Sequence, residues 1–388
     1  MQIGLVEIGA LGVSGGLLVW TWGLYTAWMV SRARRIQSVT LLPPRPLSFS
    51  IVIATRDDPG IVAARVENLR TLPDHNRPTD IILAVDSGGA WALAEYQSAL
   101  GEDVRVVPGD PSGGKSAGLN AGVRASSCDI VVLADSKQLF VAGSLDALIA
   151  AFREPGVAGV SGTVRQSSGD RTLDAYWRTD TLVRRGQSAA HSVVTTTGQI
   201  AAFLRTAYPT LPDGLICDDL YATASVIMHG HRVTFAEHAI ALDDRTFTRT
   251  QNLQRKIRTL SGLVQVCQVM PAVLNPVRNP IWIHFVSQKL LRLVTPILVM
   301  VAGWALLSLT LSLFLPVGIA RLFALAAFIP LFSVWLSIDS AAALLGPAAF
   351  LWVLLVALYN GLRKHYDVWH AHAPTTHSLL SSLAEPPP

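Results

Sequence analysis

The 388-residue sequence has little charge and few cysteines. Charged residues make up 15% of the chain, whereas soluble domains usually carry about 25%. The net formal charge is only +4, and the basic residues gather beside apolar segments, so we expect no nucleic-acid partner. Cys128, Cys217 and Cys267 lie far apart with no CxxC spacing. This pattern argues against a disulfide framework or a zinc site and is typical of a reducing compartment.

The deficit of charge is concentrated at the two ends of the chain. Residues 8–30 contain no charged side chain, and such a stretch is long enough to cross the roughly 30 Å hydrocarbon core of a bilayer. Arg32, Arg34 and Arg35 follow at once. Residues 1–35 are therefore predicted to be a transmembrane anchor, with the chain from residue 35 onward in the cytoplasm. A signal peptide would need its basic residues before the apolar run and a cleavage site after it.

A second apolar region covers residues 293–362, where Arg321 and Asp339 are the only charged residues. Its length suits about three spans of roughly 20 residues, near 293–314, 318–338 and 343–362. Three spans would carry the tail outside, yet Arg363 and Lys364 are typical of a cytoplasmic stop. Two interpretations therefore stay open: one apolar stretch is re-entrant, or the positive-inside bias is overridden. The polar tail, 363–388, is predicted to be disordered.

Residues 271–292 have an intermediate character. Apolar and polar positions interleave over 279–292, and Lys289 and Arg292 come near the end. This pattern predicts an amphipathic helix on the cytoplasmic membrane surface. The alternative is that these residues are the polar start of the next span.

Residues 36–270 have the pattern of an α/β domain. Short apolar runs, which predict strands, alternate with helical segments. The strands are expected at 49–55, 81–85, 104–107 and 129–134, and the helices at 59–71, 90–100 and 115–126. This alternation predicts a mostly parallel, Rossmann-like sheet. Ligands bind at the carboxyl ends of such strands, which is where Asp58, Asp86 and Asp135 lie.

A glycine-rich segment leads into the helix expected at 115–126. Gly113 and Gly114 precede Lys115 at its start. Backbone N–H groups and a lysine at a helix N-terminus favour an anion such as a diphosphate. The upstream glycine of a P-loop is missing at the required distance. A helix start with an incidental lysine is the structural alternative.

Several motifs occur in an order that resembles the membrane-bound family 2 glycosyltransferases, which have the GT-A fold. The similarity runs from about residue 48 to residue 260. The matching segments are Ile53–Asp58, Val85–Gly88, the G-K-x-x-x-L-N-x-G run from Gly114 to Gly122, Asp135-Ser136-Lys137 at the D-x-D position, Cys217-Asp218-Asp219 at the T-E-D position with Gly230 eleven residues after Asp219, and Arg255–Thr259 at the (Q/R)-x-x-R-W position.

The resemblance implies an inverting glycosyltransferase that uses a nucleotide-sugar, expected to be a UDP-sugar. It implies that Asp219, with Asp218 beside it, is the catalytic base, and that Gly198 and Gln199 line the acceptor pocket. The residues that it implies for donor binding are Asp58, Asp86, Lys115, Asp135, Lys137, Arg255 and Arg258. The expected location is the cell inner membrane, with the catalytic domain cytoplasmic.

Two residues depart from the family pattern. Lys137 replaces the second aspartate of D-x-D, and a protonated lysine has no lone pair for a metal. A role for Mg²⁺ or Mn²⁺, held through Asp135, is therefore in doubt. Thr259 replaces the tryptophan of the last motif. Ceramide glucosyltransferases also have a non-acidic residue at the position of Lys137, so this departure is compatible with activity.

Three functions remain open from the sequence. The favoured one is transfer of a sugar to a lipid acceptor in the membrane. A processive polysaccharide synthase, with a glycan acceptor, is the second, although such synthases usually keep D-x-D and the tryptophan. The third is a catalytically impaired membrane scaffold, for which Lys137 and Thr259 are the support.

Overall fold

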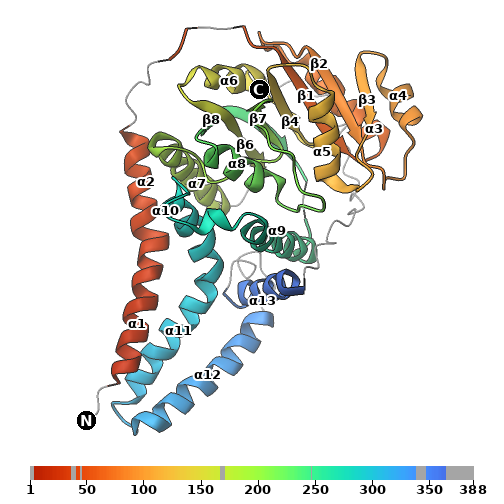
Figure 1. The fold of residues 1–388 in the computed structure, drawn as a ribbon. Coiled ribbons are helices and arrows are strands. Elements are labelled where there is room, and N and C mark those ends of the chain that lie inside the picture. The colour runs from red at the N-terminus through yellow and green to blue at the C-terminus, as the bar shows by residue number, and fades with distance from the viewer. Residues whose placement is uncertain are drawn as a thin grey trace.

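The computed structural model describes residues 4–35, 41–43, 46–166, 171–245, 247–337 and 347–363. A mixed sheet and its covering helices form one end of the molecule, and long helices extend from it as a stalk (Figure 1). Of the expected tail, 363–388, all residues after Arg363 lie outside the described residues.

Eight strands form a single sheet in the order β3-β2-β1-β4-β7-β6-β8-β5. The first four strands in this order, β3, β2, β1 and β4, are parallel, and β7 joins β4 antiparallel. The strand bounds are β1 Phe49–Thr55, β2 Asp80–Val85, β3 Val104–Pro108, β4 Ile130–Ala134, β5 Leu139–Phe140, β6 Val157–Gln166, β7 Ile200–Leu204 and β8 Arg232–Asp243. The predicted α/β domain with a Rossmann-like sheet is confirmed, with antiparallel pairs added beyond β4.

Helices cover both faces of this sheet. The helices of this end of the molecule are α3 Pro59–Thr71, α4 Leu93–Leu100, α5 Gly114–Ala125, α6 Ser144–Ala150, η2 Ala151–Arg153, α7 Arg171–Ala190, α8 Asp218–Met228, α9 Arg249–Val269 and η3 Pro271–Leu274. β1 and β4 are apolar along almost their whole length because both faces are buried. Helix α4 begins at Leu93, three residues after its expected start.

The stalk contains two long apolar helices. The first runs from Leu5 to Arg34 as α1 (Leu5–Leu18), the π-helical turn η1 (Val19–Leu24) and α2 (Tyr25–Arg34). The second runs from Trp282 to Leu311 as α10 (Trp282–Phe285), η4 (Val286–Leu290) and α11 (Leu291–Leu311). By length and composition both could cross a membrane. Residues 282–290 continue directly into α11 as one helix, so no helix boundary separates them from the next apolar segment.

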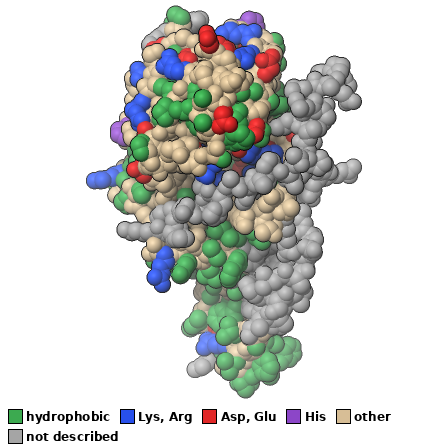
Figure 2. Space-filling model, turned by 90° about the vertical axis from the view of Figure 1, so that its right-hand side faces the viewer, with side chains coloured by type: hydrophobic (Ala, Val, Ile, Leu, Met, Phe, Trp, Pro, Cys, Tyr) green, Lys and Arg blue, Asp and Glu red, His purple; other side chains and the backbone are tan. Residues whose placement is uncertain are grey.

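Hydrophobic side chains are exposed along the stalk (Figure 2). Leu5, Val13, Leu24, Leu306 and Phe323 are each more than half exposed. Charged side chains gather instead on the α/β end of the molecule (Figure 2). Such a large exposed apolar surface marks a site of contact with lipid or another protein.

The two remaining apolar helices pack against different parts of the molecule. Helix α12 (Val317–Ser337) packs on α11 within the stalk, whereas α13 (Pro347–Arg363) packs on α9 (Figure 1). Gln268 on α9 donates a hydrogen bond to the carbonyl of Gly361 at 3.1 Å, and Asn360 donates one to Ser261 at 3.2 Å. The end of α13, at Arg363, therefore lies beside the α/β domain.

Candidate active site

Three neighbouring parallel strands end at one edge of the sheet, and an aspartate follows each of them. Asp57 comes two residues after β1, Asp86 directly follows β2, and Asp135 directly follows β4. Because β2, β1 and β4 are adjacent in the sheet, these carboxylates lie along a single edge. This edge is where ligands bind in sheets of this type.

Asp86 is nearly buried against the glycine turn before α5. Its Oδ1 accepts hydrogen bonds from the N–H groups of Gly114 at 2.8 Å and Gly88 at 3.3 Å. Its Oδ2 lies 3.5 Å from Nε of Arg56. Gly113 and Gly114 have φ of 72° and 82°, a backbone conformation that other residues rarely adopt. The glycines thus allow the turn to close over the carboxylate.

Helix α5 fixes the position of Lys115. A Cβ on Gly122 would come within 2.4 Å of the Val52 side chain, so the helix packs tightly on β1 at this point. Asn120 exchanges two 2.9 Å hydrogen bonds with the main chain of Leu211. The same helix therefore holds both the lysine and the loop that leads to α8.

Lys115 connects the edge of the sheet with the start of α8. Its Nζ lies 2.9 Å from Oδ1 of Asp135 and 3.7 Å from Oδ2 of Asp218. Burial lowers the pKa of Lys115, but the carboxylates of Asp135, Asp218 and Asp219 outweigh that effect and raise it above the ordinary value. Lys115 is therefore a permanent positive charge at this position.

Asp218 and Asp219 form the first turn of α8 but differ in surroundings. Asp218 is buried, and this burial, opposed by Lys115 and reinforced by Asp219 and Asp135, raises the pKa of its carboxyl group. Asp219 is half-buried, and its carbonyl accepts a 2.6 Å hydrogen bond from Thr223. Asp219 is thus the more accessible of the two carboxylates.

Gly198 lies where Lys115 and Asp219 meet. A Cβ on this glycine would stand 3.5 Å from Nζ of Lys115 and 3.9 Å from Oδ2 of Asp219. Gln199 follows it, half-buried, in the turn before β7. The missing side chain of Gly198 leaves room beside both charged groups.

Lys137 forms an ion pair at the position where the family pattern has its second aspartate. Its Nζ lies 2.6 Å from Oδ1 of Asp57, and Ser136 donates a hydrogen bond to the same carboxylate. Asp58, by contrast, is exposed and caps α3 by accepting a 2.7 Å hydrogen bond from the N–H of Gly60. The residue that faces the site after β1 is therefore Asp57.

The surroundings of Asp135 offer few ligands for a metal ion. Among the described residues, no three His, Cys, Asp or Glu side chains come together as a metal site. Asp135 itself is paired with Lys115. Mg²⁺ is commonly held by one or two carboxylates together with substrate phosphates, so Asp135 would need oxygens of a bound ligand to hold such an ion.

A basic group that the sequence analysis missed lies after β8. Arg245 makes two 2.7 Å hydrogen bonds to the buried Asp243, and its charge interacts with Asp135 and Asp57. Arg255 on α9 lies over the ring of Phe247, 3.9 Å from its centroid. Burial and the neighbouring Arg245 and Arg258 lower the pKa of Arg255. An arginine directly after an acidic strand end was the signal available in the sequence.

Two further arginines donate hydrogen bonds to residues in or next to the site. Arg184 on α7 donates hydrogen bonds to Ser161 at 2.5 Å and to Thr197, the residue before Gly198, at 3.0 Å. Arg65 is fully buried and donates to the carbonyl of Asp135 at 3.2 Å. Neither residue belongs to a recognisable motif, so only the fold reveals them.

Comparison with known proteins identifies the family. The family described as "Glycosyltransferase like family 2" matches residues 44–265, more than half of the chain. No curated protein matches the sequence. The mannosyltransferase PcManGT from Pyrobaculum calidifontis, in complex with GDP-Man and Mn²⁺, has a TM-score of 0.65 at 18% identity, over 92% of this chain and 99% of that chain.

A second solved structure is more distant. Glucosyl-3-phosphoglycerate synthase from Mycobacterium tuberculosis, in complex with Mn²⁺, UDP and phosphoglyceric acid, has a TM-score of 0.42 at 14% identity, over 60% of this chain and 86% of that chain. The similarity to PcManGT shows that the two chains share their fold. With its GT-A fold and its match to the family over residues 44–265, the chain belongs to glycosyltransferase like family 2 and is a glycosyltransferase.

Proposed function

We propose that the protein is an inverting glycosyltransferase that moves a sugar from a UDP-sugar to a lipid acceptor in the membrane. The observation that carries this proposal is the meeting of Lys115 and Asp219 at Gly198. This point lies at the ligand-binding edge of the sheet, in a molecule with two long apolar helices. A donor diphosphate and an acceptor hydroxyl would meet there.

The donor would lie along the carboxyl ends of β2, β1 and β4. Asp86 keeps lone pairs for ribose or base, since a carboxylate accepts about four hydrogen bonds. Lys115 and Lys137 would face the diphosphate, and Arg245, Arg255 and Arg258 would supply further positive charge. Such preorganised cations stabilise the charge that develops on a leaving diphosphate.

Asp219 is the base in this proposal. The hydroxyl oxygen of the acceptor attacks the anomeric carbon from the face opposite the diphosphate. A new carbon–oxygen bond forms as the bond to the diphosphate breaks, and the hydroxyl proton passes to the carboxylate of Asp219. Asp218 positions Lys115 rather than touching substrate, because it is buried at 3.7 Å from that lysine. A positioned base of this kind contributes roughly 10²–10⁴-fold in rate.

A divalent ion, if bound, would be held by Asp135 together with the donor diphosphate. Gly198 and Gln199 would contact the acceptor instead. The ion would add positive charge to the diphosphate. The ion pair of Lys137 with Asp57 stands where a second carboxylate ligand is usual. We therefore expect this enzyme to depend less on a metal ion than relatives with a complete D-x-D.

A membrane acceptor is favoured by the helices around the site. Lys289, near the start of the second long helix, and Arg184 both interact electrostatically with Asp219. The bilayer would surround α1–α2, α11 and α12, and α9 and α13 would lie on its cytoplasmic surface. Arg32, Arg34, Arg35 and Arg363 would then all be cytoplasmic, as the positive-inside rule requires. In a bacterium this membrane would be the inner membrane.

The test is incubation of the purified full-length protein with radiolabelled UDP- and GDP-sugars and total membrane lipid, with and without EDTA. We expect label from a UDP-sugar in lipid that extracts into organic solvent, with partial activity retained in EDTA. GDP-sugars belong in the panel because PcManGT was solved with GDP-Man.

The same incubation distinguishes the alternatives. Label in insoluble polymer would replace the lipid acceptor by a processive synthase. An absence of nucleotide release with every donor would favour the impaired scaffold. Sedimentation of the protein with membranes after alkaline carbonate extraction tests the membrane part separately.

A further inference from the structure

A pocket lies where the first long helix meets the α/β domain, away from the sheet edge that carries Asp57, Asp86 and Asp135. It has a volume of about 660 Å³, within the roughly 300–1,000 Å³ typical of ligand pockets. It is built from the end of α2, from α7, from the start of β8 and from Glu154. None of the residues proposed above for donor, acceptor or base lines it. The lining residues that matter here are Trp28, Arg32, Arg35, Glu154, Arg185, Arg232 and Glu237.

The charges of the lining do not cancel. Four arginines face two glutamates, which leaves a formal charge of +2. Arg185 lies 3.5 Å from Glu237, and Arg232 lies 3.6 Å from Glu154. Arg32 and Arg35 are exposed and form no ion pair within the described part of the chain. The excess positive charge therefore belongs to the two arginines at the end of α2.

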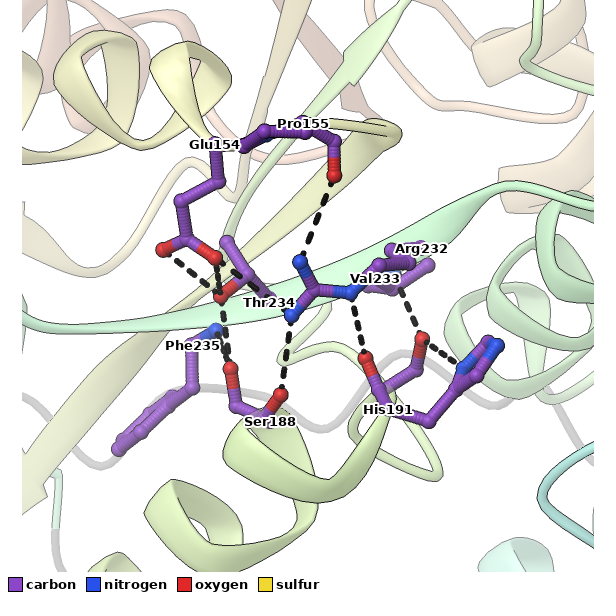
Figure 3. Close-up of polar contacts among 9 residues, drawn as sticks. Glu154, Pro155, Ser188, His191, Arg232, Val233, Thr234 and Phe235 are labelled. Carbon is purple, nitrogen blue, oxygen red and sulfur yellow. Dashed lines mark hydrogen bonds and ion pairs between the residues drawn. The ribbon is translucent and has the colours of Figure 1, made fainter. Parts of the chain in front are cut away.

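One wall of the pocket is held rigidly by Arg232. Figure 3 shows its guanidinium surrounded by oxygen atoms of Glu154, Pro155, Ser188 and His191. It donates to the carbonyls of His191 at 3.0 Å and Ser188 at 3.1 Å. Ser188 and Thr234 are also joined by a 2.7 Å hydrogen bond. Most N–H donors of Arg232 are thus engaged in this wall. Arg185 is paired with Glu237 through Nε. Arg32 and Arg35 are therefore the main groups for a ligand, and Arg185 lies beside them in the lining.

The opposite wall is fixed by close packing of α2 on α7. A Cβ on Gly186 would come within 2.1 Å of the carbonyl oxygen of Met29. The first long helix therefore docks on the domain at Gly186, one residue from Arg185. A pocket between two elements that are locked together in this way is preformed, so little ordering is needed to bind a ligand.

The position of the pocket along the first long helix indicates which class of ligand it binds. Trp28 lines it from one side, and the exposed Trp22 and Leu24 lie just below on the same helix. Tryptophan and arginine in this order mark the level of lipid headgroups at a cytoplasmic surface. A basic pocket beside a membrane helix at that level suits a phosphate that is attached to acyl chains.

We propose that this pocket binds the headgroup of an anionic phospholipid. Arg32, Arg35 and Arg185 contact the phosphate, and the acyl chains run down the apolar face of α1–α2. The inference rests on the membrane insertion that forms part of the proposed function, but not on the sugar transfer. The lipid would be a bound component of the enzyme, distinct from the acceptor.

The test measures lipid binding to the purified full-length protein by native mass spectrometry, with no donor sugar present. Dioleoyl phosphatidylglycerol is compared with dioleoyl phosphatidylcholine, which has the same chains and no net charge. We expect the wild type to prefer phosphatidylglycerol. We also expect Arg32→Gln and Arg35→Gln each to weaken its binding about tenfold, the usual scale for loss of one charge-assisted contact.

Arg34→Gln is the matched control. It removes the same charge from the same helix, but Arg34 is exposed and does not line the pocket. Equal losses in all three variants would mean a diffuse surface effect and would overturn the proposal. Equal binding of the two lipids would overturn it as well.

A soluble competitor separates a lipid from a free phosphate compound. We expect glycerol 3-phosphate to leave the bound phosphatidylglycerol in place. Displacement at equal concentrations would make the phosphate group alone the ligand, and the assignment to a lipid would fail. Lipid binding retained in a protein that transfers no sugar would overturn the proposed function and leave this inference intact.

Discussion

Lys115 and Lys137 are equally exposed, at 22% each, and both are paired with an aspartate at the same edge of the sheet. Their surroundings nevertheless differ. Lys115 contacts Asp135 and Asp218, and its charge interacts with Asp219. Lys137 contacts Asp57 in a pair that stands apart from α8. In the proposed mechanism, Lys115 therefore belongs to the group of charges around Asp219, whereas Lys137 stands at the position of the second D-x-D aspartate and pairs with Asp57.

The largest expected effect on activity within this comparison comes from the loss of the charge on Lys115. In Lys115→Met, the carboxylates of Asp135, Asp218 and Asp219 would face one another without a cation. We expect kcat/KM to fall about 10²–10³-fold, the scale for removal of one preorganised electrostatic group. Steady-state release of nucleotide measures this. Lys115→Arg, which keeps the charge, should retain more activity, and a wild-type rate in Lys115→Met would contradict the assignment.

Lys137→Asp tests whether the lysine at this position keeps a metal ion from binding beside Asp135. It restores the D-x-D pattern and removes the ion pair with Asp57, so Mn²⁺ should bind between Asp135 and the new carboxylate. Ligands that bind the folded state raise the unfolding temperature. We expect Mn²⁺ to raise that temperature by a few degrees in Lys137→Asp, and by less in wild type and in Lys137→Gln. The same shift in wild type would show that the native site already binds the ion.

Arg255→Lys should have a smaller effect. Lysine keeps the positive charge but loses the planar group that lies on Phe247, and the two side chains are not interchangeable at stacked sites. We expect the KM for the donor to rise about threefold to tenfold with little change in kcat. Arg278→Lys, at an exposed position on the η3–α10 loop, is the control. An equal change in both variants would remove Arg255 from the donor site.

The smallest expected effect is on stability. The raised pKa of Asp218 means that the folded state holds this proton more tightly than the unfolded state. Its contribution to stability is therefore present below the ordinary aspartate pKa, about 3.9, and is lost as pH rises through the raised value. Asp218→Asn has no such proton to lose, so its unfolding temperature relative to wild type should increase over that pH range. A difference that is constant with pH would contradict the shift.

Strands and local motifs were the easiest features to predict from the sequence. Strand β1 and helix α3 have the predicted bounds because apolar β-branched runs and the Asp58-Pro59 start are local signals. Lys115 and Asp135 were chosen from the same kind of local pattern. Their 2.9 Å contact depends on α5 crossing β1 at Gly122, which no local pattern encodes.

Other features depend on tertiary packing and could not be read from the chain. Asp57 and Asp58 are neighbours, and only the start of α3 decides that Asp58 caps the helix while Asp57 faces Lys137. The apolar stretch 343–362 has the length of a span, whereas α13 itself has 17 residues. Its contacts with α9 through Asn360 and Gly361 place its end beside the domain instead. Hydrophobicity alone does not show which neighbours such an apolar helix packs against.

The central claim is that Asp219 takes the acceptor proton while Lys115 and its neighbours hold the donor. The most direct measurement is single-turnover transfer by Asp219→Asn, with donor affinity measured in parallel. The asparagine keeps the shape of the side chain but is no base, so we expect the rate to fall by about 10³-fold with donor affinity nearly unchanged. Asp213→Asn, at an exposed residue of the preceding loop, should behave as wild type. Transfer by Asp219→Asn at the wild-type rate would contradict the account.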